Sequence, residues 1–152
     1  MNPLSGPTAT ASARTPGDVA WLIKQFADDA PGVTHAVVVS LDGLQLAASG
    51  AVERDLGDQI AALTAGLLSM ATRCGELLSL GTTEHLTVRL PRGHLLFMRI
   101  GESAGLAVAA AIGADLRVLA YQMTQFVTSV GHALTPQVRG DLHRLTVTPS
   151  TR

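Results

Sequence analysis

The sequence predicts an α+β domain in which a five-stranded antiparallel sheet lies between helices. Three long segments carry apolar residues at the three-and-four spacing of amphipathic helices. The pair Asp42-Gly43 joins two apolar runs, which favours a tight hairpin because glycine adopts positive φ values at little cost. Three further apolar runs are separated by turn residues and predict a meander. The expected order is helix, two strands, helix, three strands, helix.

Length and charge limit the class of protein. A chain of 152 residues forms one domain by default. Its 11 basic residues balance 12 acidic ones, so nothing electrostatic favours nucleic acid or an anionic membrane as a partner. The longest apolar run, 106–112, is far shorter than the roughly twenty residues that span a bilayer. No nucleic acid partner and no direct membrane insertion are therefore expected.

The domain is predicted over residues 16–135. A leader, 1–15, is rich in Pro, Ser, Thr and Ala and is expected to be disordered. It has neither the basic start nor the continuous apolar core of a secretory signal, so a cytoplasmic protein is expected. Residues 136–152 are predicted to be a tail, in which Val138, Leu142 and Leu145 favour a short amphipathic turn or helix.

The first and last helices have recognisable starts. Pro16 is expected to open the first helix after the N-cap Thr15, and Pro31-Gly32 to close it. Trp21 lies off its apolar face and is expected to wrap over a core edge. Asp115 is the expected N-cap of the last helix. The inward stripes are Val19, Leu22, Ile23 and Phe26 in the first helix, and Leu116, Leu119, Met123, Phe126, Val130 and Leu134 in the last.

The five strands are predicted from apolar runs between turn residues. The first hairpin is expected to use 33–41 and 44–49, and the meander to use 84–90, 94–100 and 105–112. The last of these runs is rich in small apolar side chains, which suits a strand covered on both faces. If the turn at 91–93 pairs Leu90 with His94, His85 lies opposite Arg99 and too far from His94 to share a metal.

The long helix, predicted over about 55–80, has two different faces. One is a large apolar stripe that is expected to pack on the sheet, and it includes Cys74 as a buried thiol. The opposite flank combines polar and small residues. The stripe comprises Leu56, Ile60, Leu63, Leu67, Met70, Cys74 and Leu77, and the opposite flank comprises Gln59, Ala62, Gly66, Ser69 and Arg73.

Small side chains on that opposite flank predict a contact with another helix. Ala62, Gly66 and Ser69 allow two backbones to approach closely. Gly66 is otherwise unfavourable, because glycine costs about 1 kcal/mol relative to alanine in a helix interior. The alternative is that Gly66 packs against its own loop or has no role.

The sequence carries no recognisable catalytic motif. It has no phosphate-binding loop, no dinucleotide fingerprint, no cysteine pair with zinc spacing and no nucleophile elbow. Its five histidines, at positions 35, 85, 94, 132 and 143, are scattered. No catalytic, metal-binding or cofactor-binding residue is predicted, and the chain is not expected to be an enzyme.

The order of elements and three segments resemble those of a known family. The segments are 54–67, Tyr121-Gln122-Met123 and 131–136. In them the chain resembles the roadblock/dynein light chain family, and is similar to its actinobacterial branch and to bacterial regulators of Ras-like GTPases. The resemblance covers about 16–134 and implies a profilin-like fold of the roadblock type.

The resemblance also implies a function. Such relatives are homodimers in which the long helices lie side by side and edge strands of the meander pair, with a Ras-like small GTPase on the helical surface. The chain is therefore expected to be a non-enzymatic regulator of a GTPase nucleotide cycle, in a bacterial signalling assembly that can include a sensor kinase. Carried over by position, the dimer interface is Ala62, Gly66, Ser69, Glu84, Leu86 and Val88, and the partner-docking residues are Asp58, Gln59 and Arg73.

Two other functions stay open from the sequence. One is a structural dimerisation adaptor or scaffold that leaves GTP turnover unchanged. The other is a small-molecule sensor with a pocket between sheet and helix. Little in the sequence supports it, since no convergent polar group marks such a pocket. Arg54 and Arg73 are conceivable arginine fingers, but the resemblance implies that the relatives mostly reorient residues of the GTPase itself.

Overall fold

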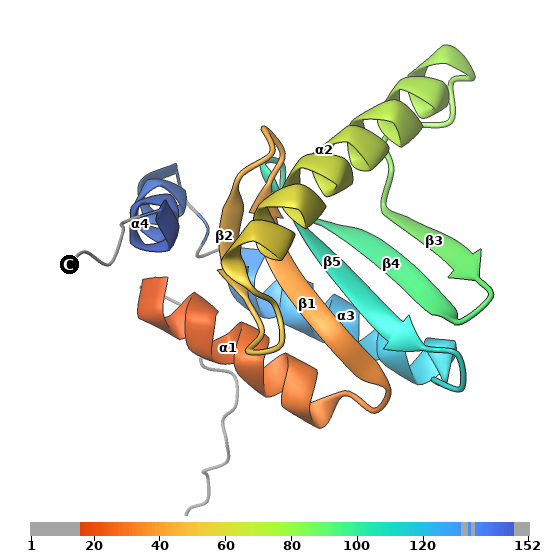
Figure 1. Ribbon diagram of the computed structural model, residues 1–152. Coiled ribbons are helices and arrows are strands. Elements are labelled where there is room, and N and C mark those ends of the chain that lie inside the picture. The colour runs from red at the N-terminus through yellow and green to blue at the C-terminus, as the bar shows by residue number, and fades with distance from the viewer. Residues whose placement is uncertain (1–15, 132–133, 135, 148–152) are drawn as a thin grey trace, which may run out of the picture.

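A five-stranded antiparallel sheet forms the centre of the molecule, as predicted. The computed structural model describes residues 16–131, 134 and 136–147 (Figure 1). The expected leader 1–15 and the expected N-cap Thr15 lie outside the described residues. The elements are α1 (Pro16–Asp29), β1 (Val33–Ser40), β2 (Gln45–Ala48), α2 (Arg54–Leu77), β3 (His85–Leu90), β4 (Gly93–Ile100), β5 (Ala104–Ala111), α3 (Leu116–Gly131) and α4 (Pro136–Val147).

The strand order is β2-β1-β5-β4-β3, with every neighbouring pair antiparallel. The last strand of the meander therefore pairs with the first strand of the hairpin, and β2 and β3 are the two edges. The prediction that the 105–112 run is covered on both faces is confirmed, because all but the C-terminal part of β5 is buried. Helices α1 and α3 cover one face of the sheet, and α2 lies on the other (Figure 1).

The main core lies between the sheet and the α1–α3 layer. The predicted inward residues Val19, Ile23 and Phe26 of α1 are buried, and the Phe26 ring lies 5.4 Å from the Phe126 ring of α3. Asp115 caps α3 as predicted, since its Oδ1 accepts hydrogen bonds from the backbone N–H groups of residues 117 and 118 at 3.0 and 3.3 Å. This layer is closed by side chains of the chain itself.

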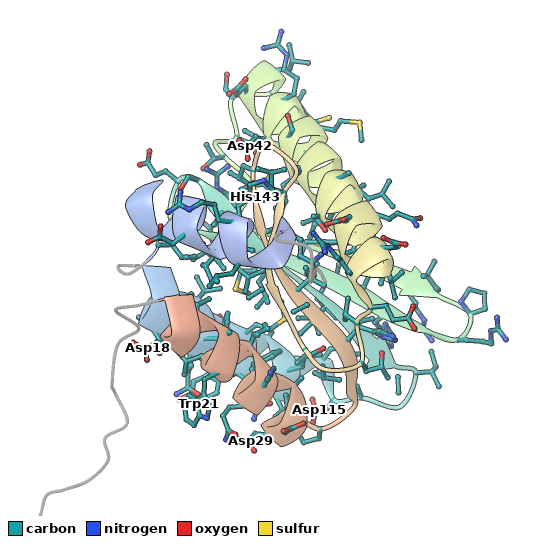
Figure 2. All side chains as sticks on the ribbon, turned by 60° about the vertical axis from the view of Figure 1, so that its left-hand side comes forward. Asp18, Trp21, Asp29, Asp42, Asp115 and His143 are labelled. Atoms are coloured by element: carbon teal, nitrogen blue, oxygen red, sulfur yellow. The ribbon has the colours of Figure 1, made fainter. Side chains whose placement is uncertain are left out.

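Trp21 does not wrap over the core edge, and that prediction is wrong. Its side chain is 60% exposed and stands on the outer side of α1, away from the sheet (Figure 2). The reason is its position on the helix, about half a turn away from the buried Val19 and Ile23.

The prediction that the large apolar stripe of the long helix packs on the sheet is wrong for most of its length. The residues of α2 that face the sheet are instead small or polar, except for Leu68: Gly57, Ala61, Thr64, Ala65 and Leu68. At Gly57 a Cβ would lie 2.3 Å from Oε1 of Gln45, because the side-chain amide of Gln45 fills the space beneath the start of α2 and donates hydrogen bonds to the carbonyl of Arg54 and to Asp58. The helix approaches the sheet so closely that only a narrow face with short side chains fits beneath it.

The β3–β4 turn is one residue shorter than predicted. Leu90 pairs with Gly93, so His94 lies opposite Arg89, and His85 lies opposite Met98 instead of Arg99. The shorter turn shifts each expected partner in β4 by one position. His85 and His94 still lie at different ends of the hairpin.

Helix α4 follows the last predicted helix and packs beside β2 and α1 (Figure 1). Leu142 is buried in the main core, whereas Leu145 is exposed. The expectation for the side chain of Val138 lies outside the described residues. Among the helices that the structure describes, none is both long and apolar enough to cross a membrane.

Candidate functional site

One side of α2 is apolar and is covered by nothing in the described part of the chain. Leu63, Met70 and Leu77 are 67%, 62% and 69% exposed. The spacing along this side alternates between four and three residues, which is the repeat that keeps one seam of a helix facing a partner helix. We call it the apolar flank, and it consists of Leu56, Ile60, Leu63, Leu67, Met70, Cys74 and Leu77.

Two members of the apolar flank, Ile60 and Leu67, are half-buried, and the other five are exposed. The sequence-based expectation of a buried thiol at Cys74 is therefore wrong. Cys74 lies in the last two turns of α2, where the helix projects beyond the sheet (Figure 1) and no strand lies beneath it.

A groove of about 330 Å³ separates the apolar flank from the sheet. Leu63, Leu67 and Met70 form its α2 wall, and Val37 and Phe97 belong to its floor on β1 and β4. The lining side chains are apolar with two exceptions, His35 and Thr64. A continuous apolar surface of this kind is typical of a site that binds another protein.

Thr64 is a buried polar side chain on the wall of this groove. The residue is fully buried, and its Oγ1 has no hydrogen-bond partner among the described residues. His35 also lines the groove, but its Nδ1 lies 2.8 Å from Oγ1 of the adjacent Thr34. These two polar groups do not converge on one point, so the groove favours an apolar occupant.

The small residues predicted for the flank opposite the apolar stripe instead border it, because Gly66 lies three residues after Leu63 and four before Met70, and they face solvent. Ala62, Gly66 and Ser69 are all exposed. A Cβ added at Gly66 would meet no atom within 4 Å, so the alternative that this glycine packs against its own loop is wrong. The described chain gives Gly66 no compensating contact, and the prediction that another helix docks there stays a prediction.

The three predicted partner-docking residues lie on α2 but do not form one cluster. Asp58 and Gln59 lie near its start and Arg73 near its end, which separates them by about 22 Å along a helix with a rise of 1.5 Å per residue. Oδ1 of Asp58 accepts a hydrogen bond of 3.0 Å from Nε2 of Gln45. Asp58 thus helps to fix the start of α2 on β2.

Gln59 and Arg73 are exposed at the surface of α2. Nη1 of Arg73 lies 3.4 Å from Oε1 of Glu76, an ion pair on the helix surface with both side chains more than half exposed. Such a pair contributes little to stability, so Arg73 can exchange it for another partner at small cost.

Strand β3 is an open edge of the sheet. The backbone N–H of Arg99 donates to the carbonyl of Glu84 at 3.3 Å. Because hydrogen-bonded and non-hydrogen-bonded pairs alternate in an antiparallel ladder, Leu86 and Val88 also direct their backbone groups toward β4. The outward-facing backbone groups are therefore those of His85, Thr87 and Arg89.

Two of the edge residues predicted for the dimer interface, Leu86 and Val88, direct their backbone groups toward β4 and present their side chains on one face of the sheet. The side chains of Leu86 and Val88 lie half-buried against the small core cluster of Leu68, Phe97 and Ala107, on the α2 side of the sheet. Glu84 precedes the strand and is exposed. The apolar flank, the groove and this edge thus border the same side of the sheet.

Among the described residues, no three His, Cys, Asp or Glu side chains gather into a group that would hold a metal ion. His94 is buried, with Nε2 3.4 Å from the carbonyl of Ile112. It is a residue of β4 that pairs with Ala110 of β5. Its hydrogen-bond contacts among the described residues include no nucleophile with an adjacent base.

Sequence reasoning missed the apolar flank as an exposed surface. A usable signal was present, because Gly57, Ala61, Thr64, Ala65 and Leu68 also follow helical spacing. The choice between two plausible inward faces depends on how closely the helix approaches its sheet. Large side chains alone do not make that choice.

Comparison with known proteins finds a family model and solved structures that match this fold. The family model described as "Roadblock/LC7 domain" matches residues 19–110. A crystal structure of a Roadblock/LC7 domain from Streptomyces avermitilis is 33% identical and has a TM-score of 0.69, over 72% of this chain and 92% of that one. No curated protein matches the chain.

Two more distant structures share the fold. The gliding protein MglB from Thermus thermophilus is 18% identical, with a TM-score of 0.69 over 78% of this chain and 90% of that one. MglB from Myxococcus xanthus is 14% identical, with a TM-score of 0.68 over 73% and 89%. At these identities the likeness concerns the arrangement of helices and strands.

Proposed function

The chain belongs to the Roadblock/LC7 domain family, and on this premise we propose that it is a non-enzymatic homodimer that binds a Ras-like small GTPase. In this proposal it modulates the nucleotide cycle of the GTPase as part of a bacterial signalling assembly. The observation that carries the proposal is the apolar flank of α2, which the described chain leaves uncovered beside an apolar groove.

The amount of apolar surface supports pairing with a second copy. Full burial of one Leu or Met side chain contributes roughly 1.5–3 kcal/mol. A twofold pair buries the flank of both protomers, so three such side chains on each contribute about 9–18 kcal/mol. This is of the same order as the roughly 4–15 kcal/mol that association costs, and hydrogen bonds along the β3 edge add to it.

Gly66 has a specific place in such a pair. When two helices pack closely, a side chain of one helix enters a hole formed by four residues of the other. On α2 one such hole is formed by residues 63, 66, 67 and 70, with Gly66 as one corner. The absent side chain makes the hole wider and lets the helices come closer. The proposed helix contact therefore joins the apolar flank with Ala62, Gly66 and Ser69 along its border.

The edge of β3 forms the second part of the proposed dimer interface. Its outward backbone groups at His85, Thr87 and Arg89 are available to a partner strand, while Leu86 and Val88 extend the apolar surface beneath it. Glu84 lies at the start of this edge. Pairing there joins two sheets into one.

A twofold pair also assembles the predicted docking residues. Gln59 and Arg73 lie seven residues before and after Gly66. In an antiparallel pair that crosses at Gly66, Gln59 of one protomer lies level with the partner's Arg73. The residues that are about 22 Å apart in one chain then form two composite polar sites, each with Asp58 nearby, on which the GTPase docks.

The test is a nucleotide-cycle assay with the Ras-like GTPase encoded in the same genome. Phosphate release and nucleotide exchange are measured with and without saturating protein. Acceleration of either step supports the proposal, and Thr128→Ala, an exposed change on the α3 side, should act like the unaltered protein. Binding without any change in either rate would make the protein a structural adaptor instead.

A further inference from the structure

Strand β2 is irregular where it lies beneath the start of α2. Ala47 pairs with Val38 of β1, and Gln45 pairs with the residue after it, Val39. Leu46 is an extra residue between these two pairs and forms a β-bulge. In a regular strand Gln45 would share a face with Ala47, which belongs to the main core. Because of the bulge, Gln45 instead turns its side chain to the other face, where α2 lies.

The amide of Gln45 fills a closed space under the first turn of α2. The residue is 6% exposed, although it belongs to an edge strand. Its Nε2 donates to the carbonyl of Arg54 at 3.2 Å and to Oδ1 of Asp58 at 3.0 Å. The three atoms nearest to a Cβ added at Gly57 all belong to this amide. The amide and a side chain at position 57 would therefore compete for one space.

The first turn of α2 has no capping side chain of its own. Glu53 occupies the N-cap position and makes no side-chain capping hydrogen bond. Such a bond usually fixes the first turn of a helix. The two hydrogen bonds from Gln45 reach Arg54 and Asp58, which lie one turn apart, so they tie that turn to β2 instead. A buried amide is costly to leave without partners, which makes this attachment specific in position.

The attachment lies on the side of α2 that faces away from the apolar flank. Asp58 and Ala62 are four residues apart and share one side of the helix, whereas Leu63 and Leu67 share the other. The hairpin turn approaches the same side as Gln45, since a Cβ at Gly43 would lie 3.8 Å from Cα of Ala62. The β1–β2 hairpin thus holds α2 from one side and leaves the apolar flank uncovered.

We propose that Gln45 is a positioning residue, whose amide sets the place of α2 on the sheet and thereby the presentation of the residues on which the GTPase docks. Gln45 is buried, so it acts without touching a partner. Gln59 directly follows Asp58, so a displaced first turn moves a member of each composite polar site. The effect on docking rests on the proposed function, whereas the placement of α2 does not.

The first test asks whether the amide and position 57 share one space. Gly57→Ala should lower the melting temperature of the otherwise unaltered chain, because the methyl group displaces the amide. In a chain that carries Gln45→Ala, the same change should leave the melting temperature unchanged or raise it, since the space is vacant and alanine favours a helix. An equal loss in both backgrounds would overturn the proposal.

A second test measures the first turn directly. Gln45→Met retains a side chain of similar length but removes both hydrogen bonds. Hydrogen exchange at the amides 57–61 should become about tenfold faster, while exchange in α3 stays the same. The matched control is Gln25→Met, which removes an amide that donates to Asp29 at 3.5 Å on α1. Unchanged exchange at 57–61 in Gln45→Met would contradict the placement of α2 by this amide.

The third test is the nucleotide-cycle assay, at a temperature at which the variants are folded. Gln45→Met should need about fivefold more protein for a half-maximal effect on the GTPase, and Gln25→Met should act like the unaltered chain. A full response from Gln45→Met, together with faster exchange at 57–61, would overturn the effect on docking. If the unaltered chain has no effect on the GTPase, the proposed function is wrong, and the melting and exchange experiments still decide whether Gln45 positions α2.

Discussion

The two faces of the sheet are covered to different extents. On one face, α1 and α3 enclose a large core with their own side chains, from Val19 to Val130. On the other, α2 alone leaves a groove of about 330 Å³ and three strongly exposed large side chains on its apolar flank. The side chains of one chain bury the first face fully. The second face keeps an exposed apolar surface, which is typical of a site that binds another molecule.

The largest effect is expected on the closed face. Phe126→Ala should lower the free energy of unfolding by about 3–5 kcal/mol, because it removes a buried ring in contact with Phe26 and leaves a cavity. Chemical denaturation measures this loss. A loss below 1 kcal/mol would mean that this layer is less tightly packed than the burial of Phe126 indicates.

The next effect separates association from folding on the open face. Leu63→Glu places a charge in the middle of the apolar flank and should weaken the dimer at least 100-fold, with little change in the unfolding of the monomer. Light scattering at several concentrations measures the mass. Val118→Glu, an exposed apolar residue of α3, is the matched control and should leave the mass unchanged.

Two glycines of α2 offer a sharper comparison within one helix. Gly57→Ala should destabilise the fold by about 1–3 kcal/mol, since its Cβ would push the buried amide of Gln45 away from its hydrogen bonds to the carbonyl of Arg54 and to Asp58. Gly66→Ala should stabilise the monomer by about 1 kcal/mol through helix propensity, because its Cβ meets open space. Thermal unfolding at protein concentrations below the dimer dissociation constant should show a lower melting temperature for Gly57→Ala and a higher one for Gly66→Ala.

A side chain at position 66 should weaken the dimer, although an alanine there stabilises the monomer. Gly66→Leu fills the hole that the proposed helix contact uses and should reduce the light-scattering mass to that of a monomer. A normal dimer in this variant would exclude the close helix approach at this position. Insolubility would leave Gly66→Ala as the informative variant, with a weakened dimer and a more stable monomer as the expected pair of results.

The smallest effect on stability is expected at Arg73. Arg73→Ala removes an exposed ion pair with Glu76 and should change the unfolding free energy by less than about 0.5 kcal/mol. In the nucleotide-cycle assay it should nevertheless lower the response of the GTPase at least fivefold. Full retention of that response would remove Arg73 from the docking surface, and Arg117→Ala on α3 controls for the loss of a positive charge.

Much of the fold follows from local sequence signals. The hairpin around Asp42-Gly43, the meander and the N-cap at Asp115 were predictable, because turn and cap chemistry acts over a few residues. The one-residue shift in the β3–β4 register was not predictable, since two-residue and three-residue turns fit the same sequence around Arg92. The order in which strands pair at β1 and β5 depends on contacts distant in sequence.

The sequence by itself determined the elements, their order and the presence of two distinct faces on the long helix. Only the tertiary structure decided which face is inward. Periodicity reports that Leu63 and Met70 share a side of α2, but not the distance at which the helix packs on the sheet. The side chains buried beneath α2 are small apart from Leu68, and Gly57 leaves room there for the side-chain amide of Gln45, so the narrow face is buried and Leu63 and Met70 stay exposed.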